Sequence, residues 1–201
     1  MCRFYDADEG EILLEGRDIR SIPLRELRAR FGVVFQNDFT PALTIAENVN
    51  FFRNLTAEQR EAAARSAQAI EFINEKAGGW EESLNIRGAN LSGGQRQRLL
   101  ISRALAGNPE ILILDDSSSA LDYRTDMCLR RALRERYGES TTVTVAQRVS
   151  SVCHADLILV LKQGRVIGSG RHEDLLDNCE EYRLIYETQM GGGSFDEESA
   201  N

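Results

Sequence analysis

The sequence lacks any long apolar segment that could cross a membrane. Its 201 residues contain no run of about 18 consecutive apolar side chains, the minimum for a membrane-spanning helix. The first residues, from Met1 to Asp6, also lack the apolar core of a secretory signal peptide. Apolar residues make up 42% of the chain and charged residues 28%, which is typical of a soluble globular protein. The length predicts one large domain, or one domain that carries a subdomain.

Cysteine and histidine are too few and too scattered to predict a disulfide framework or a metal centre. No Cys-x-x-Cys pair occurs, so we expect reduced thiols in a cytosolic protein. Cys153 and His154 are adjacent, and adjacent residues rarely bind one metal ion together. His172-Glu173 begins a zinc-protease motif, but Leu176 stands where the second histidine is required.

Positive charge is also in deficit. The chain has 24 Lys and Arg against 32 Asp and Glu, which gives a formal net charge of −8. Because nucleic acids repel an acidic surface, we predict no nucleic-acid partner.

The sequence also contains no Gly-x-x-x-x-Gly-Lys-[Ser/Thr], the loop whose backbone cradles nucleotide phosphates and whose side chains hold phosphate and Mg²⁺.

The run at residues 91–98, Leu-Ser-Gly-Gly-Gln-Arg-Gln-Arg, is the most informative feature that is present. Ser92 is a predicted helix N-cap, and Gln95 completes a capping box. Gly93 and Gly94 let an anion approach the bare backbone at the positive end of the helix dipole. The alternative is an ordinary capped surface helix, which Ser-Gly-Gly alone does not exclude.

A continuous aliphatic run follows at residues 111–114 and ends in Asp115 and Asp116. Such a run predicts a strand in a sheet that is covered on both faces, and ligands bind at the carboxyl ends of such strands. Strands alternate with helices, which predicts an α/β fold with a mostly parallel sheet flanked by helices. The expected strands cover 11–15, 31–35, 111–114, 141–145, 157–161 and 165–167, and the expected helices cover 24–30, 44–52, 56–76, 93–106, 124–136, 173–176 and 181–190.

Together these features resemble the ATP-binding-cassette family, the nucleotide-binding domains of ABC transporters. The order and spacing of four motifs agree, and the resemblance covers nearly the whole chain. Residues 91–95 match the signature motif, 111–115 the Walker B strand and 119–122 the D-loop, while Gln36 stands at the place of the Q-loop glutamine.

The resemblance implies a P-loop NTPase-like ABC cassette over residues 1–190, with a helical subdomain at about 56–106 that carries the signature. It also implies ATP and Mg²⁺ as cofactors. Asp115 and Gln36 would hold the metal, and Gln36 would act in catalysis with Asp116 and Gln147. The nucleotide would contact Ser92, Gly93, Gly94, Gln95 and Asp122.

Residues 191–201, rich in Gly and then acidic, are expected to form a disordered tail.

Two positions depart from the family pattern. The family has a glutamate that polarises the attacking water, where this chain has Asp116, whose carboxylate is shorter by about 1.5 Å. The family has a switch histidine where this chain has Gln147, which cannot carry positive charge. Both changes weaken the same step, which predicts a degenerate hydrolytic site.

The missing phosphate loop predicts a cassette truncated at its N-terminus, in which Met1 is an internal methionine. We expect this fragment alone to bind ATP weakly or not at all and to be inactive. Because the strand and the helix that flank the loop are missing too, exposed sheet edges and an exposed core should make the fragment marginally stable or prone to aggregate.

The segments at 85–88, 164–176 and 182–186 look like exporter cassettes, in which a transmembrane domain is usually fused upstream. The resemblance therefore implies a domain on the cytoplasmic face of the cell membrane. Family members act as head-to-tail dimers, so an intact signature beside altered catalytic residues predicts the degenerate half of a heterodimer. Its signature would complete the active site of a different subunit.

The leading interpretation is an ATPase domain of an ABC exporter that couples ATP binding and hydrolysis to export. A soluble ATPase of the chromosome-maintenance or DNA-repair type is disfavoured, because the chain has no coiled-coil insertion and is acidic. A non-catalytic interaction module, or a truncated inactive cassette, stays open as the alternative.

Overall fold

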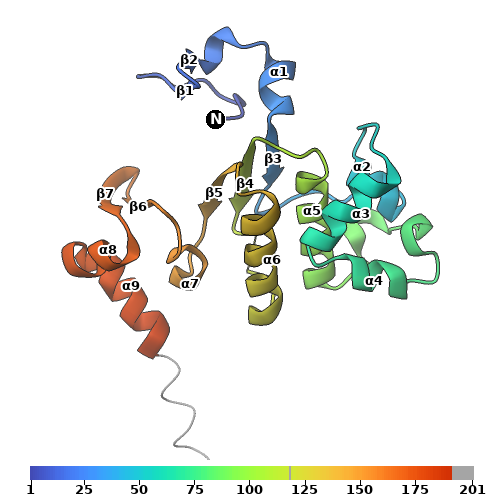
Figure 1. Ribbon diagram of the computed structural model, residues 1–201. Helices are drawn as coiled ribbons and strands as arrows, with labels where there is room; N and C mark the ends of the chain where they lie inside the picture. Colours follow the sequence, from blue (N-terminus) through green and yellow to red (C-terminus); the bar gives the residue numbers. More distant parts are fainter. Residues whose placement is uncertain (118, 192–201) are drawn as a thin grey trace, which may run out of the picture. The chain divides into compact units, whose positions relative to one another are not determined.

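The computed structural model describes residues 1–117 and 119–191 and contains two compact units (Figure 1). The first unit comprises residues 1–145, and the second begins at Ala146. Among the described residues, no helix is both long and apolar enough to cross a membrane.

A three-stranded parallel sheet forms the centre of the first unit. Its order is β3 (Phe31–Val34), β4 (Ile111–Asp115) and β5 (Thr141–Val145). In register, Val33 faces Ile113, which in turn faces Val143. The central strand is largely buried, as its aliphatic sequence predicts. Because the strands are parallel, their carboxyl ends meet at one edge, and the predicted α/β class with a parallel sheet is confirmed.

The signature helix α5 (Gly93–Leu105) packs on β3 and joins the sheet to a helical region. That region contains α2 (Ile45–Asn50), α3 (Ala57–Ser66), α4 (Ile70–Glu75) and two 3₁₀ turns, η2 (Gly79–Glu81) and η3 (Ile86–Gly88). Figure 1 shows α2, α3 and α4 gathered beside α5, while α6 (Tyr123–Arg136) follows β4. One apolar cluster runs through α2–α5, β4 and α6, so the helical region shares its core with the sheet.

The predicted single helix over 56–76 is wrong, because the chain forms α3 and α4 with a break between them. Gln68 lies at the break with φ of 58°, and its side-chain amide donates to the carbonyls of Arg65 and Ser66. The break lets α3 bury its alanines while α4 turns Phe72 and Ile73 into the same core. Tertiary burial thus overrides the local helical preference.

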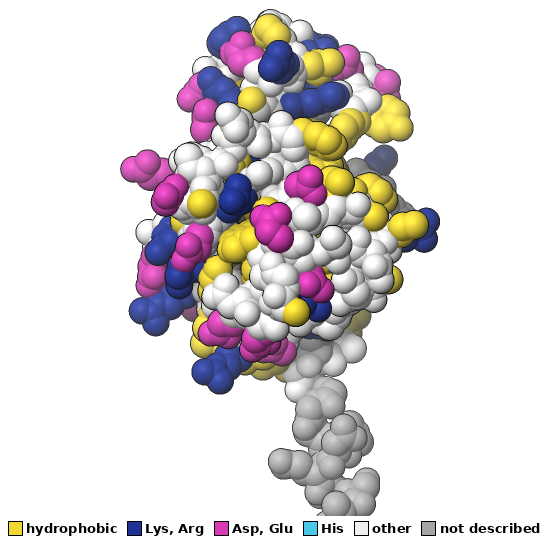
Figure 2. Space-filling view, turned by 90° about the vertical axis from the view of Figure 1, so that its right-hand side faces the viewer, with side chains coloured by type: hydrophobic (Ala, Val, Ile, Leu, Met, Phe, Trp, Pro, Cys, Tyr) yellow, Lys and Arg dark blue, Asp and Glu magenta, His cyan; other side chains and the backbone are white. Residues whose placement is uncertain are grey.

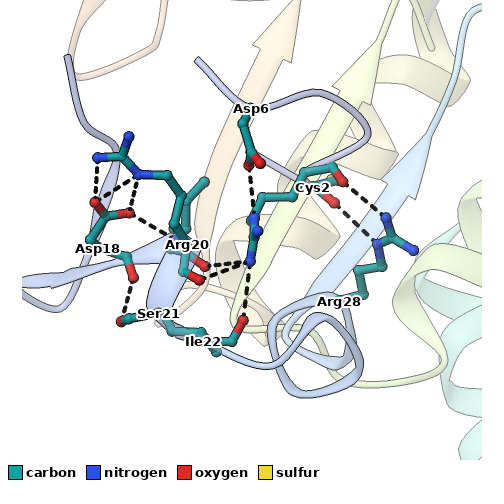
Figure 3. Close-up of polar contacts among 9 residues, drawn as sticks. Cys2, Asp6, Asp18, Arg20, Ser21, Ile22 and Arg28 are labelled. Atoms are coloured by element: carbon teal, nitrogen blue, oxygen red, sulfur yellow. Dashed lines mark hydrogen bonds and ion pairs between the residues drawn. The ribbon is translucent and has the colours of Figure 1, made fainter. Parts of the chain in front are cut away.

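The N-terminal segment forms a small β-hairpin and a short helix. The expected strand at 11–15 shortens to β1 (Leu13–Leu14), because the chain turns at Glu15 and Gly16 into β2 (Arg17–Asp18). A 3₁₀ turn, η1 (Ile19–Ser21), and α1 (Leu24–Ala29) follow. Two arginines hold the first residues against this segment (Figure 3). Arg3 Nη1 donates to the carbonyls of Ile19, Arg20 and Ile22, and Arg28 donates to those of Cys2 and Arg3.

The second unit is built on an antiparallel hairpin, β6 (Ile158–Lys162) and β7 (Arg165–Gly170), as the sequence predicts. Three helices accompany it: α7 (Val149–Val152), which the sequence did not predict, α8 (His172–Asn178) and α9 (Glu180–Gly191). Its small core contains Val149, Ile158, Leu175, Cys179 and Tyr182. Helix α9 extends through Gly191, and the remainder of the predicted tail, 192–201, lies outside the described residues.

Candidate functional site

The signature motif begins α5 with the predicted capping box. Ser92 Oγ accepts a hydrogen bond from the Gln95 N–H at 3.2 Å, and Gln95 Oε1 accepts one from the Ser92 N–H at 3.1 Å. The backbone at Gly94 passes so close to the D-loop that an added Cβ would lie 3.3 Å from the Ala120 carbonyl oxygen. The structure therefore brings the signature and the D-loop together, at a helix N-terminus suited to an anion.

The two candidate aspartates occupy the carboxyl end of β4. Asp115 is half-buried and pairs in register with Val145. Asp116 has φ of 48°, a left-handed conformation that a non-glycine residue seldom adopts. Its N–H donates to the Val145 carbonyl at 2.9 Å, and its own carbonyl accepts from Ser119 Oγ at 3.0 Å. A main-chain bond to Val145 and the side-chain hydroxyl of Ser119 thus fix the Asp116 backbone.

Gln36 lies in an exposed turn just after β3, at the same edge of the sheet as Asp115 and Asp116. Carboxylate and amide oxygens at a strand end are ligands that Mg²⁺ accepts, with the remaining positions taken by water and phosphate. In the part of the chain that the structure describes, no group of three or more Asp, Glu, His or Cys side chains is placed to hold a metal ion. Gln36, Asp115 and Asp116 carry oxygen ligands that would suit part of a magnesium–nucleotide site, and phosphate and water would have to supply the rest.

A buried arginine on the signature helix holds the segment that follows Gln36. Arg103 is 6% exposed, and its guanidinium donates to the Phe39 carbonyl at 2.8 Å and to the carbonyl and side-chain oxygens of Asn48 at 2.9 and 3.0 Å. Its Nη1 lies 3.6 Å from Asp38 Oδ1, and its guanidinium stacks over Phe51. Burial lowers the pKa of Arg103, while the Asp38 charge partly opposes that shift.

Sequence reasoning missed Arg103. A charged residue between the apolar residues Leu99–Ile101 and Ala104–Leu105 of one helix was the available signal. A lone charge inside an apolar stretch indicates a buried partner.

The D-loop aspartate has a local structural role. Asp122 caps α6, with Oδ1 accepting from the Thr125 N–H at 2.9 Å and Oδ2 from Thr125 Oγ1 at 2.7 Å. The hydrogen bond from the Thr125 backbone, followed by that from its side chain, lowers the pKa of Asp122. A nucleotide contact through this carboxylate stays a prediction.

Gln147 follows β5 by two residues and belongs to the second unit, so its surroundings are those of that unit. Its side chain is exposed. Its carbonyl accepts from Gln189 Nε2 at 2.7 Å, and the Val149 N–H donates to Gln189 Oε1 at 2.9 Å. Gln189 on α9 is the second residue near a candidate position that sequence reasoning did not find.

Comparisons with known proteins agree on one family. A sequence model described as ABC transporter matches residues 1–119. The chain is 41% identical over 193 residues to an ATP-dependent lipid A-core flippase of Shigella sonnei (strain Ss046), covering 95% of this chain and 33% of that protein. It is 42% identical over 190 residues to the uncharacterized ABC transporter ATP-binding protein YknU of Bacillus subtilis (strain 168), covering 94% and 32%.

A solved structure is also similar. The structure of a bacterial Atm1-family ABC exporter with ATP bound superposes with a TM-score of 0.90 at 37% identity. The similarity covers 94% of this chain and 34% of that chain. The chain therefore spans about a third of the length of the relatives that it matches.

Proposed function

The chain belongs to the ABC transporter family, and from that premise we propose that it is the ATP-binding cassette of an exporter. It couples ATP binding and hydrolysis to transport and lies on the cytoplasmic face of a membrane. The observation that carries the proposal is the capped signature helix, whose Gly94 packs against the D-loop that leads on from the Asp115 strand. Similarity to exporters over nearly the whole chain supports it.

Each candidate residue has a role in this proposal. Mg²⁺, when bound, would supply positive charge that neutralises the phosphates. Asp115 and Gln36 hold the metal, Asp116 orients the attacking water, and Gln147 donates a hydrogen bond to the terminal phosphate. The signature residues Ser92, Gly93, Gly94 and Gln95, with Asp122, contact nucleotide held by a second cassette.

We further propose that the cassette is the degenerate half of a heterodimer. Asp116 reaches less far than glutamate, and Gln147 cannot carry positive charge, so the chain's own site turns over slowly. The signature is intact and completes the site of a partner that has the glutamate and the histidine.

Exposed apolar side chains around the Q-loop suit the membrane domain that this function requires. Phe39, Phe52 and Ile86 are 56%, 90% and 73% exposed. A hydrogen bond from the Leu84 N–H to the Leu43 carbonyl ties the segment before the signature to the segment after the Q-loop. The side of the molecule in Figure 2 shows hydrophobic side chains among interspersed acidic and basic ones. We propose that a transmembrane domain, fused upstream, docks on the surface that carries Phe39, Phe52 and Ile86.

The test restores both family residues in the intact protein. Asp116→Glu with Gln147→His should raise ATP turnover by about 10- to 100-fold. The longer glutamate side chain would reach the attacking water, and histidine could carry positive charge toward the phosphate. Glu139→Gln, an exposed carboxylate before the amino end of β5, is the matched control and should change nothing. Asp115→Ala should abolish Mg²⁺-dependent turnover. No gain in the restored variant would favour the non-catalytic module, and fast turnover by a wild-type homodimer would contradict the heterodimer.

A further inference from the structure

The backbone of the loop that carries Gln147 is held by one side chain from the last helix. Gln189 Nε2 donates to the Gln147 carbonyl at 2.7 Å, and Gln189 Oε1 accepts from the Val149 N–H at 2.9 Å. The two bonded groups lie on either side of Arg148 and are 42 and 40 residues from Gln189 in sequence. The Gln189 amide therefore bonds the backbone on both sides of Arg148.

The bond from the Val149 N–H to Gln189 Oε1 caps a helix whose own N-cap residue makes no capping bond. Helix α7 begins at Val149, and Arg148 at its N-cap position makes no side-chain capping bond. The first N–H groups of a helix have no intrahelical partner, and Val149 is only 5% exposed, so its N–H needs an internal acceptor. Gln189 Oε1 is that acceptor.

Gln189 is presented from a helix that Tyr182 anchors in the small core of the second unit. Tyr182 of α9 lies in the same small core as Val149, and its hydroxyl lies 2.8 Å from Nδ1 of His172. Glu181 pairs with Lys162 on β6 at 2.6 Å. Because α9 and α7 pack on one core, the position of Gln189 fixes the backbone on either side of Arg148.

We propose that Gln189 is a positioning residue for Gln147 in ATP hydrolysis. The inference rests on the proposed function, in which the exposed Gln147 side chain reaches the terminal phosphate. The Gln147 carbonyl accepts from Gln189 Nε2, so the direction in which the Gln147 side chain leaves the backbone depends on this bond. The amide donates to one backbone group through Nε2 and accepts from the other through Oε1, so both bonds come from one side chain. The last helix thereby acts on the hydrolytic step without touching nucleotide.

The test measures ATP turnover of the intact protein with Gln189→Leu, which removes both bonds at nearly constant volume. We expect kcat to fall about tenfold with KM for ATP changed less than about twofold, because the side chain is displaced and binding is untouched. Gln189→Glu keeps the acceptor for Val149 but loses the donor to Gln147, and should lower kcat similarly. Thr188→Val, which loses only a bond to the Leu184 carbonyl within α9, is the matched control.

A double-mutant cycle separates positioning from general structural damage. In a Gln147→Ala background, Gln189→Leu should have no further effect on kcat, because no side chain remains to be positioned. An equal fall in both backgrounds, or no effect of Gln147→Ala itself, would overturn the inference. Hydrogen exchange at the Val149 amide should accelerate in Gln189→Leu, and unchanged exchange would overturn the inference as well. A wild-type protein that neither binds nor hydrolyses ATP would instead overturn the proposed function and this inference together.

Discussion

Two loops that follow strands of the sheet are each held by one side chain from another helix, but the two side chains differ in charge and burial. After β3, the segment at Asp38 and Phe39 is held by Arg103, a cation that is 6% exposed. After β5, the segment from Gln147 to Val149 is held by Gln189, a neutral amide on an exposed residue. Arg103 lies on α5, which contributes to the large apolar cluster of the first unit, and Gln189 lies on α9, which contributes Tyr182 to the small core of the second unit.

The difference predicts how far each loop can be altered without damage to the fold. Removing a buried cation leaves several acceptors without a donor and one carboxylate without a counter-charge. Removing the Gln189 amide leaves two backbone groups without a partner, but it leaves no charge unpaired. Gln189 is therefore the residue through which loop position can be changed while the fold is kept, whereas Arg103 links loop position to stability.

The largest expected effect follows from Arg103→Met. This substitution should lower the free energy of unfolding by about 3 kcal/mol, because the oxygens of Asn48 and Phe39 lose their donor and Asp38 loses its cation. Urea denaturation measures the change. Arg96→Met is the control on the same helix, since Arg96 is exposed and makes one long hydrogen bond of 3.4 Å. Equal losses in both variants would contradict the role assigned to burial.

The loop after β4 offers a third case, in which the neighbouring strand and the loop itself provide the anchor. Asp116 is held by the Val145 carbonyl of β5 and by the Ser119 hydroxyl of its own loop. Asp116 is held at φ of 48°, so Asp116→Val should cost about 1–2 kcal/mol of stability, because a β-branched residue is strained there. Asp116→Gly should change stability by less than about 0.5 kcal/mol, since glycine adopts this conformation freely. If valine and glycine gave the same unfolding midpoint, the left-handed backbone would not be a constraint at this position.

A smaller effect is expected from Asp38→Asn, which keeps the shape of the Arg103 network and removes one charge. The asparagine oxygen can still accept from the Phe39 N–H, now bonded at 2.7 Å, so the loss should be about 1 kcal/mol. In the Arg103→Met background the same substitution should cost almost nothing, because the ion pair is already gone. Full additivity in urea denaturation would show that the 3.6 Å pair does not couple the two residues.

Features set by neighbours in sequence were predictable, and those set by distant partners were not. The capping boxes at Thr56 and Ser92 follow from residues three apart, and both are present. The aliphatic strand β4 follows from its own composition and is confirmed. The break at Gln68 depends on which face of each helix meets the core, which local propensity does not contain.

The same distinction applies to the candidate site. Motif spacing placed Gln36, Asp115 and Asp116 at strand ends, and the parallel sheet brings those ends to one edge. Arg103 contacts residues more than 50 positions away and Gln189 residues about 40 away, so no local pattern pointed to either contact. The four-residue helix α7 was missed for the same reason, since its cap comes from α9.

The smallest expected effect is a pH dependence of stability, which distinguishes the charged cap Asp122 from the neutral side chain Gln189. The Thr125 hydrogen bonds lower the pKa of Asp122 below its ordinary value of 3.8, so the stability that this cap contributes is present above that value and is lost as pH falls through the lower, folded-state pKa. Asp122→Ala should therefore lower the thermal midpoint at about pH 6 and less so at about pH 3. Gln189 does not titrate, so the effect of Gln189→Leu should be the same at both values. If Asp122→Ala lowered the thermal midpoint equally at both pH values, the charge of Asp122 would not contribute to its capping role. Charge would then not distinguish Asp122 from Gln189.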